Sequence, residues 1–301
     1  MATSLAVIGT LLLSSSIFGF LPDKSNSEGL SDGELFLTPL AADYNNGFSI
    51  YYAQNNNKII GEDNLLSLDL AKSFSIRRWY FKNNNILEIG GGIGAKNYFV
   101  TPGDSSTANL ASIGTNELLS VGSDYIISNH IGYLLSNLVF RLSWNYESKQ
   151  TARQFEEYLA EAPNEEQRGL ANDQQGNPRQ EFSGDTLEIL IADVRELLRY
   201  YVAIGTYSTI NLDISDKRFA RIGFDYRGNQ GNIRLVFGGE AIAYGYNEGE
   251  ISYRALVGFE KSKTPVNGWR VSAILEEGPS TYGPYYDNGV SSLGIKATRF
   301  F

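Results

Sequence analysis

Apolar and polar residues alternate along most of this chain, in segments of about ten residues separated by clusters of turn-forming residues. Residues 138–147 give the clearest example. Every second residue from Leu138 to Tyr146 is apolar or aromatic, and the residues between them, Arg141 among them, are mostly polar. Because successive side chains of a strand point to opposite faces, this segment is predicted to be a strand with one apolar and one polar face.

Similar segments recur through the whole chain and bring the number of predicted strands to about twelve. In chain order they are 48–53, 66–70, 87–94, 119–128, 138–147, 187–191, 198–206, 221–226, 233–243, 251–260, 269–276 and 293–298. Beyond the N-terminal 21 residues, no apolar stretch reaches the length of about 18 residues that a membrane-spanning helix needs. The sequence therefore predicts an all-β protein whose antiparallel strands follow one another up and down.

One residue fits this alternation badly. Lys72 falls on the apolar face of the second predicted strand. The pattern therefore predicts either a bulge that resets the register at Lys72 or an early end of this strand.

Charged residues lie in mid-strand on the polar face. Nine of them are candidate lumen-facing residues: Glu88, Asp124, Arg141, Arg221, Arg234, Glu240, Arg254, Glu276 and Lys296. A small soluble barrel fills its interior with apolar side chains, whereas a membrane barrel turns apolar residues to lipid and keeps a polar lumen. These charges favour a transmembrane barrel. A soluble β-sandwich or lipocalin-like barrel remains the alternative, with the same charges facing solvent.

The connections between the segments alternate in length. If the first strand starts from the periplasm, the odd-numbered connections are extracellular and are the longer set. These are 55–63, 100–114, 149–183, 208–215, 245–250 and 278–289, and the even ones are 79–85, 129–136, 194–197, 228–231 and 261–268. Long loops on one side and short turns on the other are typical of outer-membrane barrels. The chain also ends on Phe301, and a terminal aromatic residue on a last strand is typical of barrel-assembly substrates.

The N-terminal region predicts export. Leu5 to Leu21 is apolar or small throughout and is followed by a polar break at 22–26. We expect a signal peptide at 1–21, a periplasmic segment at 22–45 and the barrel at 46–301 of a Gram-negative outer-membrane protein. The alternative, a single anchoring helix, would be short for a membrane span and would contain three consecutive serines.

Composition agrees with a β-rich chain that has many turns. There are 19 Tyr, 16 Phe and 31 Gly, and Tyr and Phe favour strands while Gly marks turns. The formal net charge of −9 gives the chain no electrostatic reason to bind nucleic acid. The absence of Cys excludes a disulfide framework, a thiolate metal site, a cysteine nucleophile and a lipoprotein anchor.

Candidate catalytic and metal-binding residues are few. A barrel acyl hydrolase needs a Ser nucleophile and a His base on the outer wall. The single histidine, His130, falls in the connection 129–136, on the predicted periplasmic side and away from outer-leaflet lipid. The acidic residues show no EF-hand spacing, and the glycine run 90–94 lacks the Lys and helix start of a phosphate loop. No metal, cofactor or catalytic residue is predicted.

The longest predicted loop, 149–183, contains the one predicted helix. Thr151 would cap it, and Phe155, Tyr158 and Leu159 would form one face. This helix could fold over or into the barrel mouth, meet a partner, or lie on the surface of an acidic loop.

Two motifs resemble an uncharacterised bacterial family of outer-membrane proteins, a domain of unknown function. Residues 34–43, ELFLTPLAAD, are similar to its entry motif, and 278–286, GPSTYGPYY, to its last extracellular loop. That family often carries a His-x-Ser-x-His-like run after the strand 138–147. In this chain the corresponding stretch, 146–150, keeps Ser148 but fills neither histidine position. The resemblance implies an outer-membrane barrel and no activity.

The sequence thus favours a non-enzymatic outer-membrane barrel, either structural or a narrow, closed channel. Both signs of charge occur on the polar face, and we expect them to pair across the lumen and close it. The alternatives are a hydrolase acting on membrane lipid and a scaffold for a surface or periplasmic partner. Expected partners are outer-membrane lipid and the barrel-assembly machinery, with no nucleic acid and no identified protein partner.

Overall fold

The structure is a computed structural model. Nearly all of the residues that it describes lie in strands. It describes residues 27–32, 47–55, 64–81, 85–101, 118–153, 155–157, 181–195, 197–210, 216–228, 233–245, 249–264, 267–279 and 289–300. The predicted signal peptide 1–21, the motif 34–43 and most of the motif 278–286 lie outside these residues. In the described residues no helix is long and apolar enough to cross a membrane.

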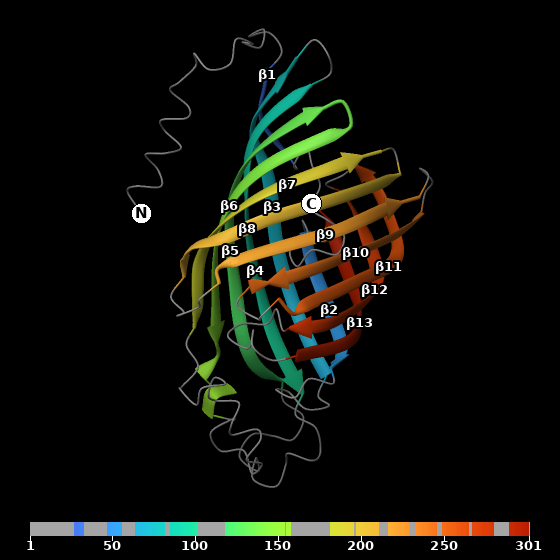
Figure 1. Cartoon of the computed structure of the whole chain (residues 1–301). Helices are drawn as coiled ribbons and strands as arrows, with labels where there is room; N and C mark the ends of the chain where they lie inside the picture. Colours follow the sequence, from blue (N-terminus) through green and yellow to red (C-terminus); the bar gives the residue numbers. More distant parts are fainter. Residues whose placement is uncertain are drawn as a thin grey trace.

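Twelve strands close into one antiparallel barrel (Figure 1). They are β2 (Gly47–Asn55), β3 (Asn64–Tyr80), β4 (Ile86–Thr101), β5 (Leu119–Leu135), β6 (Leu138–Thr151), β7 (Phe182–Val194), β8 (Leu198–Ile210), β9 (Arg218–Arg227), β10 (Arg234–Tyr244), β11 (Ile251–Thr264), β12 (Asn267–Pro279) and β13 (Gly289–Phe300). Each strand from β3 to β12 pairs with its two chain neighbours, and β13 pairs with β2 to close the wall. The predicted up-and-down barrel of about twelve strands is confirmed.

A thirteenth strand, β1 (Ser27–Asp32), adds no new position to the barrel. It pairs antiparallel with residues 74–79 of β3, whereas β2 pairs with residues 64–71 of the same strand. β1 and β2 therefore follow one another along one edge of β3. The alternation pattern did not indicate this element.

The two ends of the barrel differ in their connections. We call the end with the connections β3–β4, β5–β6, β7–β8, β9–β10 and β11–β12 the turn end, and the opposite end the loop end. The connection between β5 and β6 has only two residues, 136–137, and Ser136 there has a φ of 56°, a left-handed conformation that two-residue hairpins commonly need. The longest connection, between Thr151 and Phe182, lies at the loop end and includes the short helix at 153–157.

Alternation separates the two faces of the wall. Outward side chains are mostly apolar and exposed, and include Ile50, Leu70, Ile93, Ile127, Leu142, Ile189, Val202, Ile222, Leu235, Val257, Val271 and Leu293. Inward side chains are mostly buried and are polar at many positions. This is the distribution of a barrel surrounded by lipid, and the reverse of a soluble barrel.

The register shifts lie at other places than the one that the alternation suggested. The strand β3 neither ends nor changes register at Lys72, because it runs on to Tyr80 and its register shift comes at Ile76. Lys72 therefore keeps the outward parity of Leu70. A second shift lies at Val121, which moves it and Leu119 to the buried face.

The predicted connection 129–136 is wrong for most of its length. β5 continues to Leu135, so that His130 lies within the strand and not in a turn. Its side chain points inward and is buried. Strand β6 pairs with β5 along this whole stretch, from Leu135 opposite Leu138 to His130 opposite Ser143. Residues 129–135, seven of the eight predicted as a connection, therefore lie in the wall of the barrel.

Candidate functional site

The charged interior of the barrel is the candidate site. All nine candidate residues lie on the inward parity of their strands. Glu88, Asp124, Glu240, Glu276 and Lys296 are buried, and Arg141, Arg221, Arg234 and Arg254 are half-buried. The barrel brings them together with further inward charges of both signs.

A ladder of alternating charge crosses strands β3 to β6. Asp69, Lys96, Asp124 and Lys149 stand directly opposite one another on consecutive strands, so that each neighbour has the opposite sign. Opposite charges at facing positions stabilise a sheet, whereas like charges destabilise it. The hydroxyl of Tyr98 adds a hydrogen bond to Asp124 Oδ2 at 2.5 Å.

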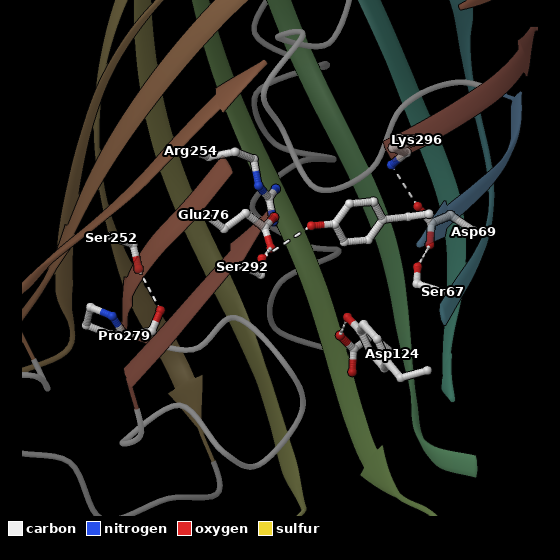
Figure 2. Close-up of polar contacts among 11 residues, drawn as sticks. Ser67, Asp69, Asp124, Ser252, Arg254, Glu276, Pro279, Ser292 and Lys296 are labelled. Atoms are coloured by element: carbon white, nitrogen blue, oxygen red, sulfur yellow. Dashed lines mark hydrogen bonds and ion pairs between the residues drawn. The ribbon is translucent and has the colours of Figure 1, made fainter. Parts of the chain in front are cut away.

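The same ladder reaches the last strand. Lys296 on β13 donates a hydrogen bond to Asp69 Oδ2 at 2.7 Å, across the intervening strand β2 (Figure 2). Asp69 also accepts a hydrogen bond from the Ser67 hydroxyl. Asp69 thus has cations on both sides, Lys296 and Lys96, in a place where it is 1% exposed.

A second ladder crosses strands β7 to β12. Arg221 lies between two carboxylates, with 2.7 Å from Nη2 to Glu188 Oε1 and 3.2 Å from Nη1 to Glu240 Oε2. Glu240 stands opposite Arg254, which in turn stands opposite and pairs with Glu276. Figure 2 shows Arg254 and Glu276 together beside Ser292.

Nearer the turn end, one carboxylate lies between an arginine and the only histidine. Arg78 Nε donates to Glu88 Oε2 at 2.6 Å, and His130 Nε2 is hydrogen-bonded to Glu88 Oε1 at 3.1 Å. Gly90 makes room for this arrangement, because a Cβ there would lie 2.6 Å from His130 Cε1. The glycine run 90–94 is therefore part of a strand, where it leaves space for inward side chains.

The turn end of strands β8 to β12 holds more arginines than acids. Its inward charges are Arg199, Asp225, Arg227, Arg234, Glu260 and Arg270, which we call the arginine cluster. Arg199 pairs with Asp225. Glu260 accepts from Arg234 Nε at 3.1 Å and lies 3.7 Å from Arg270 Nη1.

The pairs run along the wall and do not cross the lumen. The ion pairs described above join strands that are adjacent or separated by one strand, as in Arg254 with Glu276 and Lys296 with Asp69. These pairs show contacts between strand neighbours, and pairing between opposite walls stays a prediction. In a barrel of this width, the strand neighbour is nearer than the opposite wall.

Apolar residues line the interior near the loop end. Leu65, Val100, Leu119 and Val121 belong to one buried cluster with Phe155 from the short helix. Phe155 is completely buried. Of the three alternatives left open for this helix, the structure favours the one in which it enters the barrel mouth.

Several members of these networks are not among the nine candidates, although alternation already placed Asp69, Asp225, Glu260 and Arg270 on the polar face of their strands. They are Asp69, Lys96, Lys149, Glu188, Arg199, Asp225, Arg227, Glu260 and Arg270. Strand parity was the signal that could have identified them, because each lies an even number of residues from another inward residue of its own strand. The weaker alternation of β7 and β8 hid Glu188 and Arg199.

The outer wall carries the serine that a hydrolase would need. Ser148 on β6 lies on the same outward parity as Tyr146, and Ser183 and Asp185 of β7 are opposite these two residues. His130 lies on the inner face of β5. The wall of the barrel thus separates the only histidine from Ser148. No three His, Cys, Asp or Glu side chains of the described residues gather as metal ligands.

Comparison with solved structures shows the fold. Outer membrane phospholipase A from Escherichia coli aligns with a TM-score of 0.52 and 12% identity, over 90% of this chain and 94% of that one. The calcium-bound outer membrane phospholipase dimer of Salmonella typhi gives the same TM-score and coverage at 13% identity. An outer membrane channel from Pseudomonas putida F1 aligns with a TM-score of 0.43 and 13% identity, over 88% of this chain and 100% of that one.

No family model and no curated protein matches the chain. The resemblance to the family of unknown function therefore remains a prediction that rests on its two motifs. Identities this low establish fold and no activity. The chain has the fold of bacterial outer-membrane β-barrel proteins.

Proposed function

We propose that the protein is a non-enzymatic outer-membrane barrel whose lumen is closed, or nearly closed, in its resting state. The observation that carries this proposal is the burial of the inward charges. Glu88 is 0%, Asp69 1% and Asp124 2% exposed. In a wide, water-filled pore such side chains would be in contact with solvent.

The ion pairs give this burial a physical basis. A charge removed from water is costly unless a partner and further hydrogen bonds replace its hydration. Asp69 is held between Lys296 and Lys96, and Arg221 binds two carboxylates. The ladders thus allow a polar interior to pack with little water, which supports a structural role or a narrow gated channel over an open porin.

The apolar outer wall supports location in the outer membrane. Outward residues such as Ile93, Ile204 and Leu293 are exposed on most strands, where only lipid would cover them. A closed barrel also leaves no unpaired strand edge in lipid. Outer-membrane lipid and the barrel-assembly machinery are accordingly the proposed partners.

Conductance tests the closed lumen directly. Purified protein in planar bilayers should give little steady current, whereas Arg221→Ala should raise it, because two carboxylates would lose their shared cation and draw in water. Arg218→Ala, which removes an exposed arginine paired with Asp216 outside the barrel interior, is the matched control. A large steady current through the unaltered protein would overturn the proposal and favour a porin.

Lipid hydrolysis is the weaker candidate because His130 lies inside the barrel and Ser148 outside. The purified barrel should release no fatty acid from phospholipid vesicles, with or without Ca²⁺. Hydrolysis that disappears in Ser148→Ala would contradict the non-enzymatic proposal.

A further inference from the structure

The arginine cluster at the turn end carries more positive than negative charge. Its four guanidinium groups face two carboxylates, those of Asp225 and Glu260. The ladders nearer the loop end are different, since cations and carboxylates alternate there along the wall. An excess of like charge in a poorly solvated interior is unfavourable unless a counter-ion balances it.

Among the residues that the structure describes, Arg227 is the arginine of the cluster whose guanidinium group has no ion pair. It is the last residue of β9, and its charge interacts with those of Arg199, Arg270, Asp225 and Glu260. It makes no ion pair with any described residue, and its Nε is buried without a hydrogen-bond acceptor. The Nε–H of this guanidinium group thus lacks the acceptor that a buried donor requires.

The surface that the cluster presents is cationic. Asp225 is 1% and Glu260 5% exposed at the side chain, whereas Arg199 is 11% and Arg234 22% exposed. The acids are thus covered by their own ion pairs, while faces of the arginines remain accessible. Arg227 and Arg234 flank the β9–β10 connection, so the cluster lies close to the opening at the turn end.

The choice of cation is also informative. All four positive residues of the cluster are arginine, as in the second ladder, whereas lysine serves at three positions of the first ladder, Lys96, Lys149 and Lys296. The planar guanidinium fork binds two oxygens of a carboxylate or phosphate at once, which the ammonium group cannot do.

We propose that the arginine cluster is a binding site for a small oxyanion, a phosphate or carboxylate group, that enters from the turn end and is held by Arg227 with Arg199 and Arg234. This site goes beyond the proposed closed barrel and does not depend on it. An oxyanion there would supply acceptors for Arg227 and balance the excess of positive charge. The turn end is the predicted periplasmic side, so the anion would come from the periplasm.

Calorimetric titration of the folded barrel in a zwitterionic detergent tests this site. Inorganic phosphate and succinate are the two probes, each at constant ionic strength against sodium chloride. At least one probe should bind saturably, with one site per chain. The ratio of the two dissociation constants identifies the preferred oxyanion. The Arg227→Gln variant should bind at least about tenfold more weakly, because it loses one charge-assisted hydrogen-bonding group.

The exposed Arg218→Gln variant is the matched control and should bind like the unaltered protein. Heat-modifiable gel mobility checks that each variant is folded. If Arg227→Gln does not fold, Arg227→Lys should fold and still bind more weakly, because it keeps the charge and loses the fork.

Absence of saturable binding of both probes to the unaltered barrel would overturn the site. So would equal binding by folded Arg227→Gln and the unaltered protein. Because this titration does not measure current, a conducting lumen would refute the proposed function and leave the binding result standing.

Discussion

Lys296 Nζ lies 2.7 Å from Asp69 Oδ2, and this contact joins the last strand of the barrel to its second strand. The two residues are 227 positions apart in the chain. Their contact spans β2 and therefore reinforces the seam where the barrel closes. Pairing of the first and last strands removes the two edges of the sheet. An ion pair across this seam therefore stabilises the closed barrel.

Replacement of Lys296 should weaken the closed barrel. In Lys296→Met, Asp69 keeps Lys96 as its one nearby cation, and the free energy of unfolding should fall by about 3 kcal/mol, the lower end of the range for breaking a buried pair. Urea unfolding of the barrel in lipid vesicles measures this loss. The double variant Lys296→Met with Asp69→Leu removes both charges and should recover part of it. Equal losses in the single and double variants would show that the pair itself is unimportant.

The topology of the barrel can be tested on intact cells. Asn137 lies in the exposed two-residue turn between β5 and β6, and Gly169 lies in the long connection between β6 and β7. A membrane-impermeant thiol reagent should label Gly169→Cys and not Asn137→Cys, because long loops of outer-membrane barrels face outward from the cell. The chain has no native cysteine to interfere. Labelling of Asn137→Cys alone would reverse the orientation.

The lipid-facing band can be tested at two adjacent residues. Leu142 on β6 points outward and is 40% exposed, while Arg141 points inward. Leu142→Arg should lower the free energy of unfolding by roughly 2–4 kcal/mol, since it places a charge against the lipid core. Arg141→Leu should cost less, and both are measured by urea unfolding in vesicles. If Leu142→Arg is no worse than Arg141→Leu, the assignment of faces fails.

Phe155 provides a test of the loop-end mouth. This completely buried residue belongs to the same buried cluster as apolar residues of β3, β4 and β5. Phe155→Ala should lower stability by about 3 kcal/mol, at the low end for such truncations because the site is at the edge of the barrel. It should also raise single-channel conductance in planar bilayers. Phe155→Leu keeps most of the volume and serves as control, and a Phe155→Ala variant with unaltered stability and current would exclude a sealing role.

The sequence alone predicted the features that follow from the two-residue period of a strand, namely the strands themselves and the face on which each side chain lies. Alternation over 138–147 and 251–260 identified β6 and β11, because side-chain direction in a strand is set by the backbone of that strand alone. The same local rule assigned inward parity to the candidate charges and outward parity to the apolar residues. The order of long and short connections was predicted from the residues at which the alternation stops.

Only the three-dimensional structure showed the features that depend on the register between strands, such as the positions of bulges and the true ends of strands. The bulges at Ile76 and Val121 insert one residue against a partner strand, so a single strand's pattern does not show where parity changes. His130 looked like a turn residue because Gly132 and Asn129 surround it, yet pairing with β6 keeps the whole stretch in the wall.

The partners of the inward charges could likewise not be predicted from the sequence. Parity showed that Arg221, Glu240 and Arg254 share one face, but not which carboxylate each arginine meets. That depends on the relative shift of neighbouring strands, and each shift is set by all the hydrogen bonds of the ladder together. The position of Arg227 is therefore visible only in the closed barrel, where the two carboxylates of the cluster, Asp225 and Glu260, pair with Arg199 and Arg234.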